Sequence, residues 1–342
     1  MKRKIITLSL LMTFCMFVSA FVWYGQRHKL NDDHSVYQLL LALGETKVKH
    51  DRGIPDSQLI QQGEDIVLKG RTQLEGKGYS NYVSKFYVCT NCHNVAREDP
   101  DLQVMDPDKR LEYTQGKQLP FLQGSTFYGI VNRASWYNDD YIKKYGDLVK
   151  PARNDLSEAV QLCAKVCSQG RYLKDWELEA VMAYLWSLEL KLEDLALPDA
   201  LLKELENAQA SGQKNPALAK QLKRYYATKS PATFSAPPAD KAKGYEGIIG
   251  NAENGAKIYA SGCQHCHKPN GASRLVLDDS KFTFRKLKRN LNKSNNFSIY
   301  EIVRHGTHAL EGHKAYMPHY TLERMSHQQV EDLKAFILEK AK

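Results

Sequence analysis

Two short motifs hold the residues of this chain that are best suited to chemistry, Cys89-Thr90-Asn91-Cys92-His93 and Cys263-Gln264-His265-Cys266-His267. Each has the pattern C-x-x-C-H, which is typical of covalent attachment of c-type haem. In that chemistry two thiols on one turn form thioethers with the haem, and the histidine that follows binds the iron. With 7 cysteines and 11 histidines in 342 residues, about 0.005 such motifs are expected by chance. We therefore interpret the chain as a dihaem cytochrome c, with two haem c groups held by these cysteines and with His93 and His267 as proximal ligands.

The alternative for either motif is a redox-active cysteine pair or one half of a zinc site. A structural zinc ion needs four ligands in a tetrahedron. No further C-x-x-C and no H-x-x-x-H segment is present in the sequence to complete that set. The haem interpretation is therefore favoured for both motifs.

The N-terminus predicts export. Lys2 to Lys4 precede an apolar run from Ile5 to Tyr24, and Val18-Ser19-Ala20 resembles a signal-peptide cleavage site. The same run, at 1.5 Å per residue, would span roughly 30 Å of hydrocarbon. Residues 1–24 are thus a cleaved signal or a retained anchor. Because haem is attached outside the cytoplasm, we expect a periplasmic protein, which a retained anchor would hold at the inner membrane.

The net charge of the chain is +9. For an exported cytochrome this charge favours an acidic protein partner or an anionic substrate. No nucleic-acid motif is present and the basic residues are spread along the chain, so we expect no nucleic-acid binding. The partner that we expect is an electron-accepting or electron-donating redox protein, or the membrane pool of carriers.

The pattern of helices predicts an all-α fold with two cytochrome c-like domains. We expect domain 1 over residues 25–191, a partly helical linker over 192–247, and domain 2 over 248–342. Each domain should open with a helix that contains a glycine for close helix approach, Gly63 in one and Gly255 in the other. Each should close with an amphipathic helix, predicted at 176–190 and 326–340. Between them we expect a long loop through Pro100, Pro107 and Pro120 and a helix from Leu156 to Gly170.

The second haem has a clear candidate for its sixth ligand. Met317 follows His267 by 50 residues, in Tyr316-Met317-Pro318, just before the closing helix. Met/His ligation raises the haem potential and suits electron transfer. The alternatives are Met325 or one of four histidines, His305, His308, His313 and His319.

The first haem lacks such a methionine. Met105 lies in an acidic, proline-flanked stretch and Met182 on the apolar face of the closing helix. Cys163 and Cys167 stand where the ligand is expected, and a thiolate is a strong donor that lowers the haem potential and is also a nucleophile. A disulfide is disfavoured for cysteines four residues apart in one helix, and buried free thiols are the remaining alternative.

Residues 57–190 carry a family resemblance in several segments: Asn81-Tyr82, Cys89 to His93, Gly129-Ile130-Val131-Asn132-Arg133, Leu162-Cys163, Cys167-Ser168-Gln169-Gly170-Arg171 and Ala183-Tyr184-Leu185. Together they resemble the dihaem thiosulfate dehydrogenases, which form tetrathionate. In that family the ligand cysteine precedes the glycine of a Ser-Met-Asn-Gly-like motif by seven residues, so the resemblance gives the iron-ligand role to Cys163. The motif's Ser-Met-Asn is Cys167-Ser168-Gln169 here, and the arginine after the haem motif is Arg97 in a different register.

The resemblance implies an oxidoreductase that couples two thiosulfate ions into tetrathionate, or catalyses the reverse, with Cys163 as a covalent carrier of sulfur. Arg97, Arg133 and Arg171 could hold the dianion, and the alternative for each is a haem propionate partner or a surface charge. Two other functions are a dihaem electron carrier without its own substrate and a redox or gas sensor. The basic stretch from Lys281 to Lys293 is either a docking site for an acidic acceptor or a solvated face.

Overall fold

The computed structural model describes residues 30–53 and 55–342. Helices make up most of the regular structure, and the one small sheet is the antiparallel pair β1 (Gln73–Leu74) and β2 (Gly78–Tyr79). This agrees with the predicted all-α class. The predicted signal or anchor segment, residues 1–24, lies outside the described residues. Within residues 30–53 and 55–342, no helix has the length and apolar character needed to cross a membrane.

The chain divides into two compact units. One combines the described residues up to Lys47 with Leu190–Tyr225, and the other combines Val48–Glu189 with Tyr226–Lys342. Both C-x-x-C-H motifs belong to the second unit. The helices of the expected linker belong to the first unit, together with the segment that follows residue 29. The predicted boundaries at 191/192 and 247/248 stay a prediction.

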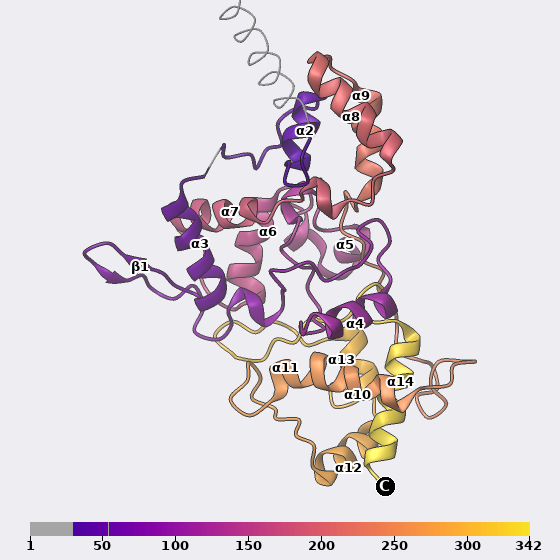
Figure 1. Cartoon of the computed structure of the whole chain (residues 1–342). Helices are drawn as coiled ribbons and strands as arrows, with labels where there is room; N and C mark the ends of the chain where they lie inside the picture. Colours follow the sequence, from indigo (N-terminus) through magenta and orange to yellow (C-terminus); the bar gives the residue numbers. More distant parts are fainter. Residues whose placement is uncertain (1–29, 54) are drawn as a thin grey trace, which may run out of the picture. The chain divides into compact units, whose positions relative to one another are not determined.

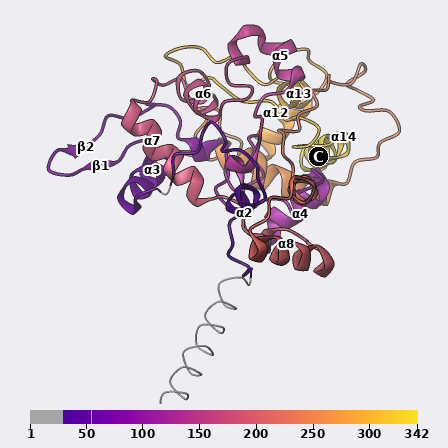
Figure 2. The same cartoon turned by 90° about the horizontal axis from the view of Figure 1, so that it is seen from above.

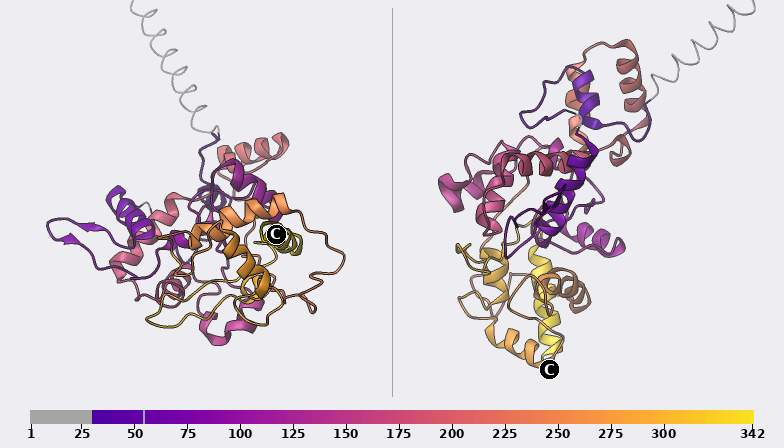
Figure 3. Two further views of the ribbon diagram at one scale, coloured as in Figure 1. Left: turned by 90° about the horizontal axis from the view of Figure 1, so that it is seen from below. Right: turned by 90° about the vertical axis from the view of Figure 1, so that its left-hand side faces the viewer.

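The first unit contains α2 (Val36–Ala42), α8 (Asp199–Ser211) and α9 (Pro216–Leu222). Figures 1 and 3 show α2 beside α8 and α9. The segment after α2 joins this group, because Asn215 N–H donates to the Leu43 carbonyl at 2.9 Å and Lys223 pairs with Glu45 at 2.7 Å.

The second unit contains the remaining helices, which are α3 (Ser57–Lys69), α4 (Pro107–Gly116), α5 (Asp139–Tyr145), α6 (Leu156–Leu162), α7 (Asp175–Ser187), α10 (Ala252–Ile258), α11 (Gln264–His267), α12 (Lys281–Asn290), α13 (Ile299–His305) and α14 (His327–Lys340). Two pairs among them pack most extensively, α3 with α7 and α10 with α14. Figure 2 shows the first pair side by side, and Figure 1 shows the second.

A glycine stands at each of these two helix crossings, as the sequence predicted. A Cβ atom on Gly63 would lie 1.9 Å from the Ala180 carbonyl oxygen, and one on Gly255 would lie 2.0 Å from the Asp332 carbonyl oxygen. Neither position can hold a larger residue unless the helices separate. The two halves of the unit thus share one kind of contact. In each half, the helix before the haem motif (α3 or α10) crosses the last helix of that half (α7 or α14) at a glycine.

Two of the predicted elements differ from the structure. The loop expected through Pro100, Pro107 and Pro120 contains α4, which has Asp106 as its N-cap and Pro107 as its first residue. Proline is favoured at that position, where its missing N–H removes no helical bond. The helix predicted to run from Leu156 to Gly170 is α-helical only to Leu162, and Cys163–Cys167 form a π turn.

Candidate functional site: two haem-attachment motifs and their axial side chains

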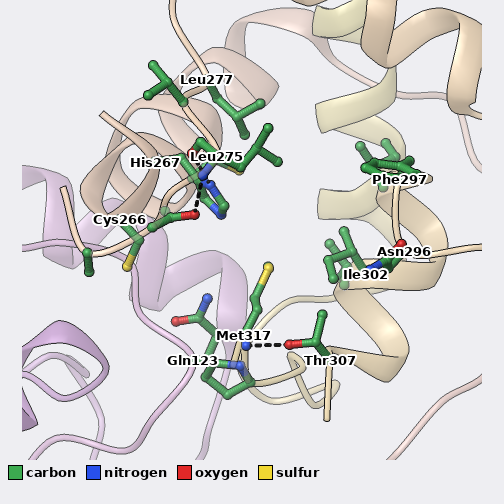
Figure 4. Close-up of a pocket in the computed structure, with 18 of the residues that line it drawn as sticks. Gln123, Cys266, His267, Leu275, Leu277, Asn296, Phe297, Ile302, Thr307 and Met317 are labelled. Atoms are coloured by element: carbon green, nitrogen blue, oxygen red, sulfur yellow. Dashed lines mark hydrogen bonds between the residues drawn. The ribbon is translucent and has the colours of Figure 1, made fainter. Parts of the chain in front are cut away.

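The second motif borders a cavity of about 450 Å³. The π turn Tyr259–Cys263 and α11 carry its cysteines and histidine in succession. Cys263, Cys266, His267 and Met317 are all among the lining residues. Figure 4 shows His267 and Met317 pointing into the cavity from two different segments of the chain. The volume lies in the range of about 300–1,000 Å³ that is usual for cofactor sites.

His267 is oriented by one backbone bond. Its Nδ1 lies 2.8 Å from the Leu275 carbonyl oxygen, so Nδ1 carries the proton and Nε2 is left for a metal. Burial lowers the pKa of His267, which favours the neutral imidazole. This is the orientation that a proximal haem ligand needs.

The backbone of Met317 is held by two hydrogen bonds to Thr307. The Met317 N–H donates to Thr307 Oγ1 at 2.6 Å, and Thr307 N–H donates to the Met317 carbonyl at 2.9 Å. Gly306, directly before Thr307, has φ of +65°, and a Cβ there would lie 2.5 Å from the Met317 carbonyl oxygen.

The alternative sixth ligands are less favourably placed. The four histidines His305, His308, His313 and His319 are not among the residues that line the cavity, in the part of the chain that the structure describes. Met325 borders the cavity but is fully buried in the hydrophobic core. Two thiols, an imidazole and a thioether around one mostly apolar cavity fit a haem c group.

The first motif orients its histidine in the same way. His93 Nδ1 lies 2.7 Å from the Ser125 carbonyl oxygen, and burial lowers the pKa of His93. Phe127 stacks on the imidazole with ring centroids 4.6 Å apart. A Cβ on Gly124 would lie 2.6 Å from the His93 ring, so a glycine is needed where this loop passes. The first motif therefore also presents a neutral imidazole with Nε2 available.

Cys163 and Cys167 meet beside this motif. The π turn that carries them closes with a bond from Ser168 N–H to the Cys163 carbonyl at 2.8 Å, and the two thiols hydrogen-bond to each other. Cys163 also lies close enough to Cys89 and Cys92 to interact with them electrostatically. The six cysteines within the described residues are free of disulfides.

The two thiols differ in their surroundings. The hydrogen bond with Cys167, together with burial, raises the pKa of Cys163 well above its ordinary value. The bond with Cys163 and a second bond with the Tyr316 hydroxyl lower the pKa of Cys167. Met182, the methionine of the closing helix, is fully buried in the core, as expected.

Phenol groups surround the thiol pair, and the sequence analysis did not anticipate them. Tyr137 interacts electrostatically with both thiols, and Tyr145 hydrogen-bonds with Tyr316. Burial raises the pKa of Tyr145 to about 12, so its hydroxyl stays protonated. The available signal was the aromatic tract from 127 to 145 and the position of Tyr316 directly before Met317.

The three arginines that were candidates to hold the dianion each contact another group of the protein. Arg171 pairs with both oxygens of Glu177, at 2.6 and 2.7 Å. Arg97 donates to the backbone carbonyls of residues 99 and 100, at 2.9 and 2.8 Å. Arg133 Nη1 lies 3.3 Å from Ser125 Oγ, the residue whose carbonyl accepts the His93 bond. Arg133 is thus next to the proximal histidine.

The two motifs touch each other. Cys266 Sγ lies 3.4 Å from the Asn91 carbonyl oxygen. Nearby, Phe121 N–H donates to the Ser261 carbonyl at 3.1 Å. Two haems attached here would therefore be neighbours. Among the described residues no group of three or more histidine, cysteine or acidic side chains is placed to hold a metal ion.

Comparison with known proteins bears on the second motif. Residues 250–337 match the family model described as cytochrome c oxidase, cbb3-type, subunit III. No curated protein and no solved structure matches the chain. The matched range contains Cys263, Cys266, His267 and Met317. This part of the chain is therefore a c-type cytochrome domain, which carries haem c and transfers electrons.

Proposed function

We propose that the chain is a periplasmic dihaem oxidoreductase that converts thiosulfate into tetrathionate, or catalyses the reverse. The first haem would be the site of sulfur chemistry, and the second would pass electrons to a redox protein or to the membrane pool. The observation that carries the proposal is the pair Cys163 and Cys167, which lies next to Cys89 and Cys92 where an ordinary cytochrome c has a methionine.

The chemistry needs a sulfur nucleophile beside an electron acceptor. The thiolate of the pair, which the resemblance assigns to Cys163, and one thiosulfate ion form a Cys–S–S–SO₃⁻ adduct with release of two electrons. The sulfane sulfur of a second thiosulfate attacks the adduct, releases tetrathionate and restores the thiolate. When bound, haem would supply the one-electron acceptors for these two electrons.

Binding of the anion would use donors that stay protonated. Tyr137, Tyr145 and Tyr316 are phenols near the thiols, and burial raises the pKa of all three. Neutral donors of this kind hydrogen-bond to sulfonate oxygens. Arg133 would add its positive charge from the proximal side of the first haem, because it is buried beside Ser125, whose carbonyl accepts the His93 bond. Arg97 and Arg171 are less suited to this role because carbonyls and Glu177 occupy them.

The test is turnover of the purified holoprotein with each anion. We expect thiosulfate to be oxidised with ferricyanide as acceptor, or tetrathionate to be reduced with reduced methyl viologen as donor. Cys163→Gly should keep both haems attached and lose this activity, whereas Cys167→Ser should be much milder. A wild-type protein that is inert toward both anions, yet exchanges electrons readily with a redox partner, would establish the second candidate, a dihaem electron carrier. The cytochrome domain at residues 250–337 favours that candidate.

A further inference from the structure

One loop, residues 306–317, contacts both haem-motif sites. At its end Met317 faces the cavity of the second motif, and Thr307 fixes the Met317 backbone from the other end of the loop. The residue before Met317 is Tyr316, whose hydroxyl hydrogen-bonds with Cys167. Adjacent residues have Cα atoms about 3.8 Å apart. A displacement of the Met317 backbone is therefore expected to displace Tyr316 as well.

Further contacts hold the loop against the first site. Lys165, in the π turn between the two cysteines, pairs with Glu311 of the loop at 2.6 Å. Tyr87, two residues before Cys89, donates its hydroxyl to the Tyr316 carbonyl at 3.2 Å. The Tyr145 hydroxyl bonds to the Tyr316 hydroxyl. Tyr316 is thus held through both its backbone and its side chain.

We propose that Tyr316 is a positioning residue of the first haem site and that the loop 306–317 couples ligation by Met317 at the second haem to the thiol pair at the first. This rests on the thiolate ligation in the proposed function, but not on the identity of the sulfur substrate. The sequence suggested two independent sites, because Cys167 and Tyr316 are far apart along the chain.

The physical basis is donation of a hydrogen bond to sulfur. A donor to a ligating thiolate withdraws electron density, which raises the reduction potential of the iron. If Cys167 binds iron, Tyr316 acts on the ligand directly. If Cys163 binds iron, Tyr316 acts through the bond between the two thiols, because hydrogen bonds in a chain polarise one another. Removal of the hydroxyl should lower the potential of the first haem in both cases.

The first experiment measures both midpoint potentials in the full-length holoprotein. Tyr316→Phe keeps the ring and removes the hydroxyl, and we expect a lower potential for the first haem with an unchanged potential for the second. The matched control is Tyr141→Phe, a buried phenol of the same tract for which no hydrogen bond to either thiol is found. Equal potentials in wild type and Tyr316→Phe, or an equal shift in the control, would overturn the positioning role.

The second experiment tests the coupling without redox chemistry. Trypsin cleaves after Lys165, so the two thiols fall on separate peptides, Asn154–Lys165 and Val166–Arg171. We expect Met317→Ala to increase the rate of Cys167 alkylation by iodoacetamide several-fold, because the loop loses its attachment at the second haem. Unchanged alkylation would refute the coupling. Failure of sulfur-anion turnover with these shifts intact would instead contradict the proposed substrate alone.

Discussion

At the scale of single residues, the two sites have the same proximal ligand, a histidine, and differ in the candidate sixth ligand. His93 and His267 are both neutral imidazoles whose Nδ1 bonds to a carbonyl. The candidate sixth ligand is a thioether, Met317, in the second site and one of a pair of thiols in the first. Since a thioether favours ferrous iron and a thiolate favours ferric iron, electrons should run from the first site toward the second.

The substitution Met317→Ala tests this assignment. The second haem should lose its sixth ligand, bind external imidazole or carbon monoxide, and show a lower midpoint potential. Cys263 and Cys266 remain, so two haems should still stay with the polypeptide after acid-acetone extraction. Visible spectra and redox titration are the measurements. If the second haem keeps its spectrum and its potential, another residue is the ligand.

At the scale of elements the sequence was informative where a constraint is local. Gly63 and Gly255 were expected at close helix contacts, and both stand at crossings. The π turn at Cys163–Cys167 could not be foreseen, because one extra residue in a turn hardly alters the apolar pattern of the helix before it. The stretch expected as a loop from Pro100 to Pro120 contains α4, because proline is favoured at the first position of a helix. Tyr316 was missed because its partners come from distant segments.

The crossing of α10 with α14 gives a prediction about stability. Gly255→Ala places a Cβ where the Asp332 carbonyl oxygen lies, so the helices must separate, which we expect to cost about 1–3 kcal/mol. The control is Gly116→Ala, since no atom lies within 4 Å of a Cβ at that helical position. Alanine should match or exceed wild-type stability there. Urea unfolding of the holoproteins, followed by circular dichroism, measures both. Equal midpoints for Gly255→Ala and wild type would mean that the contact is not close.

At the scale of the whole molecule, a buried ion cluster joins the segments that follow the two motifs. Glu98, only 1% exposed, pairs with Arg324 at 3.1 Å and with Arg110 at 3.8 Å. Arg110 also donates to the Arg324 carbonyl. Glu98 lies five residues after His93, whereas Arg324 lies just before α14. A sequence alone does not indicate which charges pair across 226 positions, so this contact was not predicted.

The cluster predicts a specific loss of stability in acid. Its two arginines hold the pKa of Glu98 at about 2, against the opposing effect of burial. A depressed carboxyl pKa contributes stability above its unfolded value, near 4.5, and this is lost as the pH falls toward 2. Asp99, whose pKa burial raises to about 6, acts in the opposite sense. The useful quantity is therefore the difference between wild type and Glu98→Gln.

Glu98→Gln leaves two buried cations without their counter-charge, so we expect a loss of about 3–5 kcal/mol at neutral pH. The difference from wild type should shrink as the pH falls from 4.5 to 2. Asp147→Asn, in an exposed pair with Lys150, is the control and should not alter the unfolding midpoint. A constant difference between Glu98→Gln and wild type at all pH values would mean that Glu98 is not ionised in the folded protein.

Helix α12 gives a prediction about electron exit. Its sequence, Lys-Phe-Thr-Phe-Arg-Lys-Leu-Lys-Arg-Asn, contains no acidic residue, and Phe282 is 76% exposed. Phe282 and Lys286 both border the cavity of the second motif. An apolar centre with a cationic rim at a haem pocket is suited to an acidic or anionic electron acceptor.

Oxidation of the reduced protein by the anion ferricyanide should therefore slow as salt increases, because ions screen the attraction. Lys286→Glu should slow it further at low salt and speed the reaction with cationic hexaammineruthenium. Lys77→Glu, at an exposed position between β1 and β2 of the same unit and not among the residues that line the cavity, is the control and should leave both rates near wild type. If it changes them as much as Lys286→Glu does, the net charge of the protein, and not α12, attracts the acceptor.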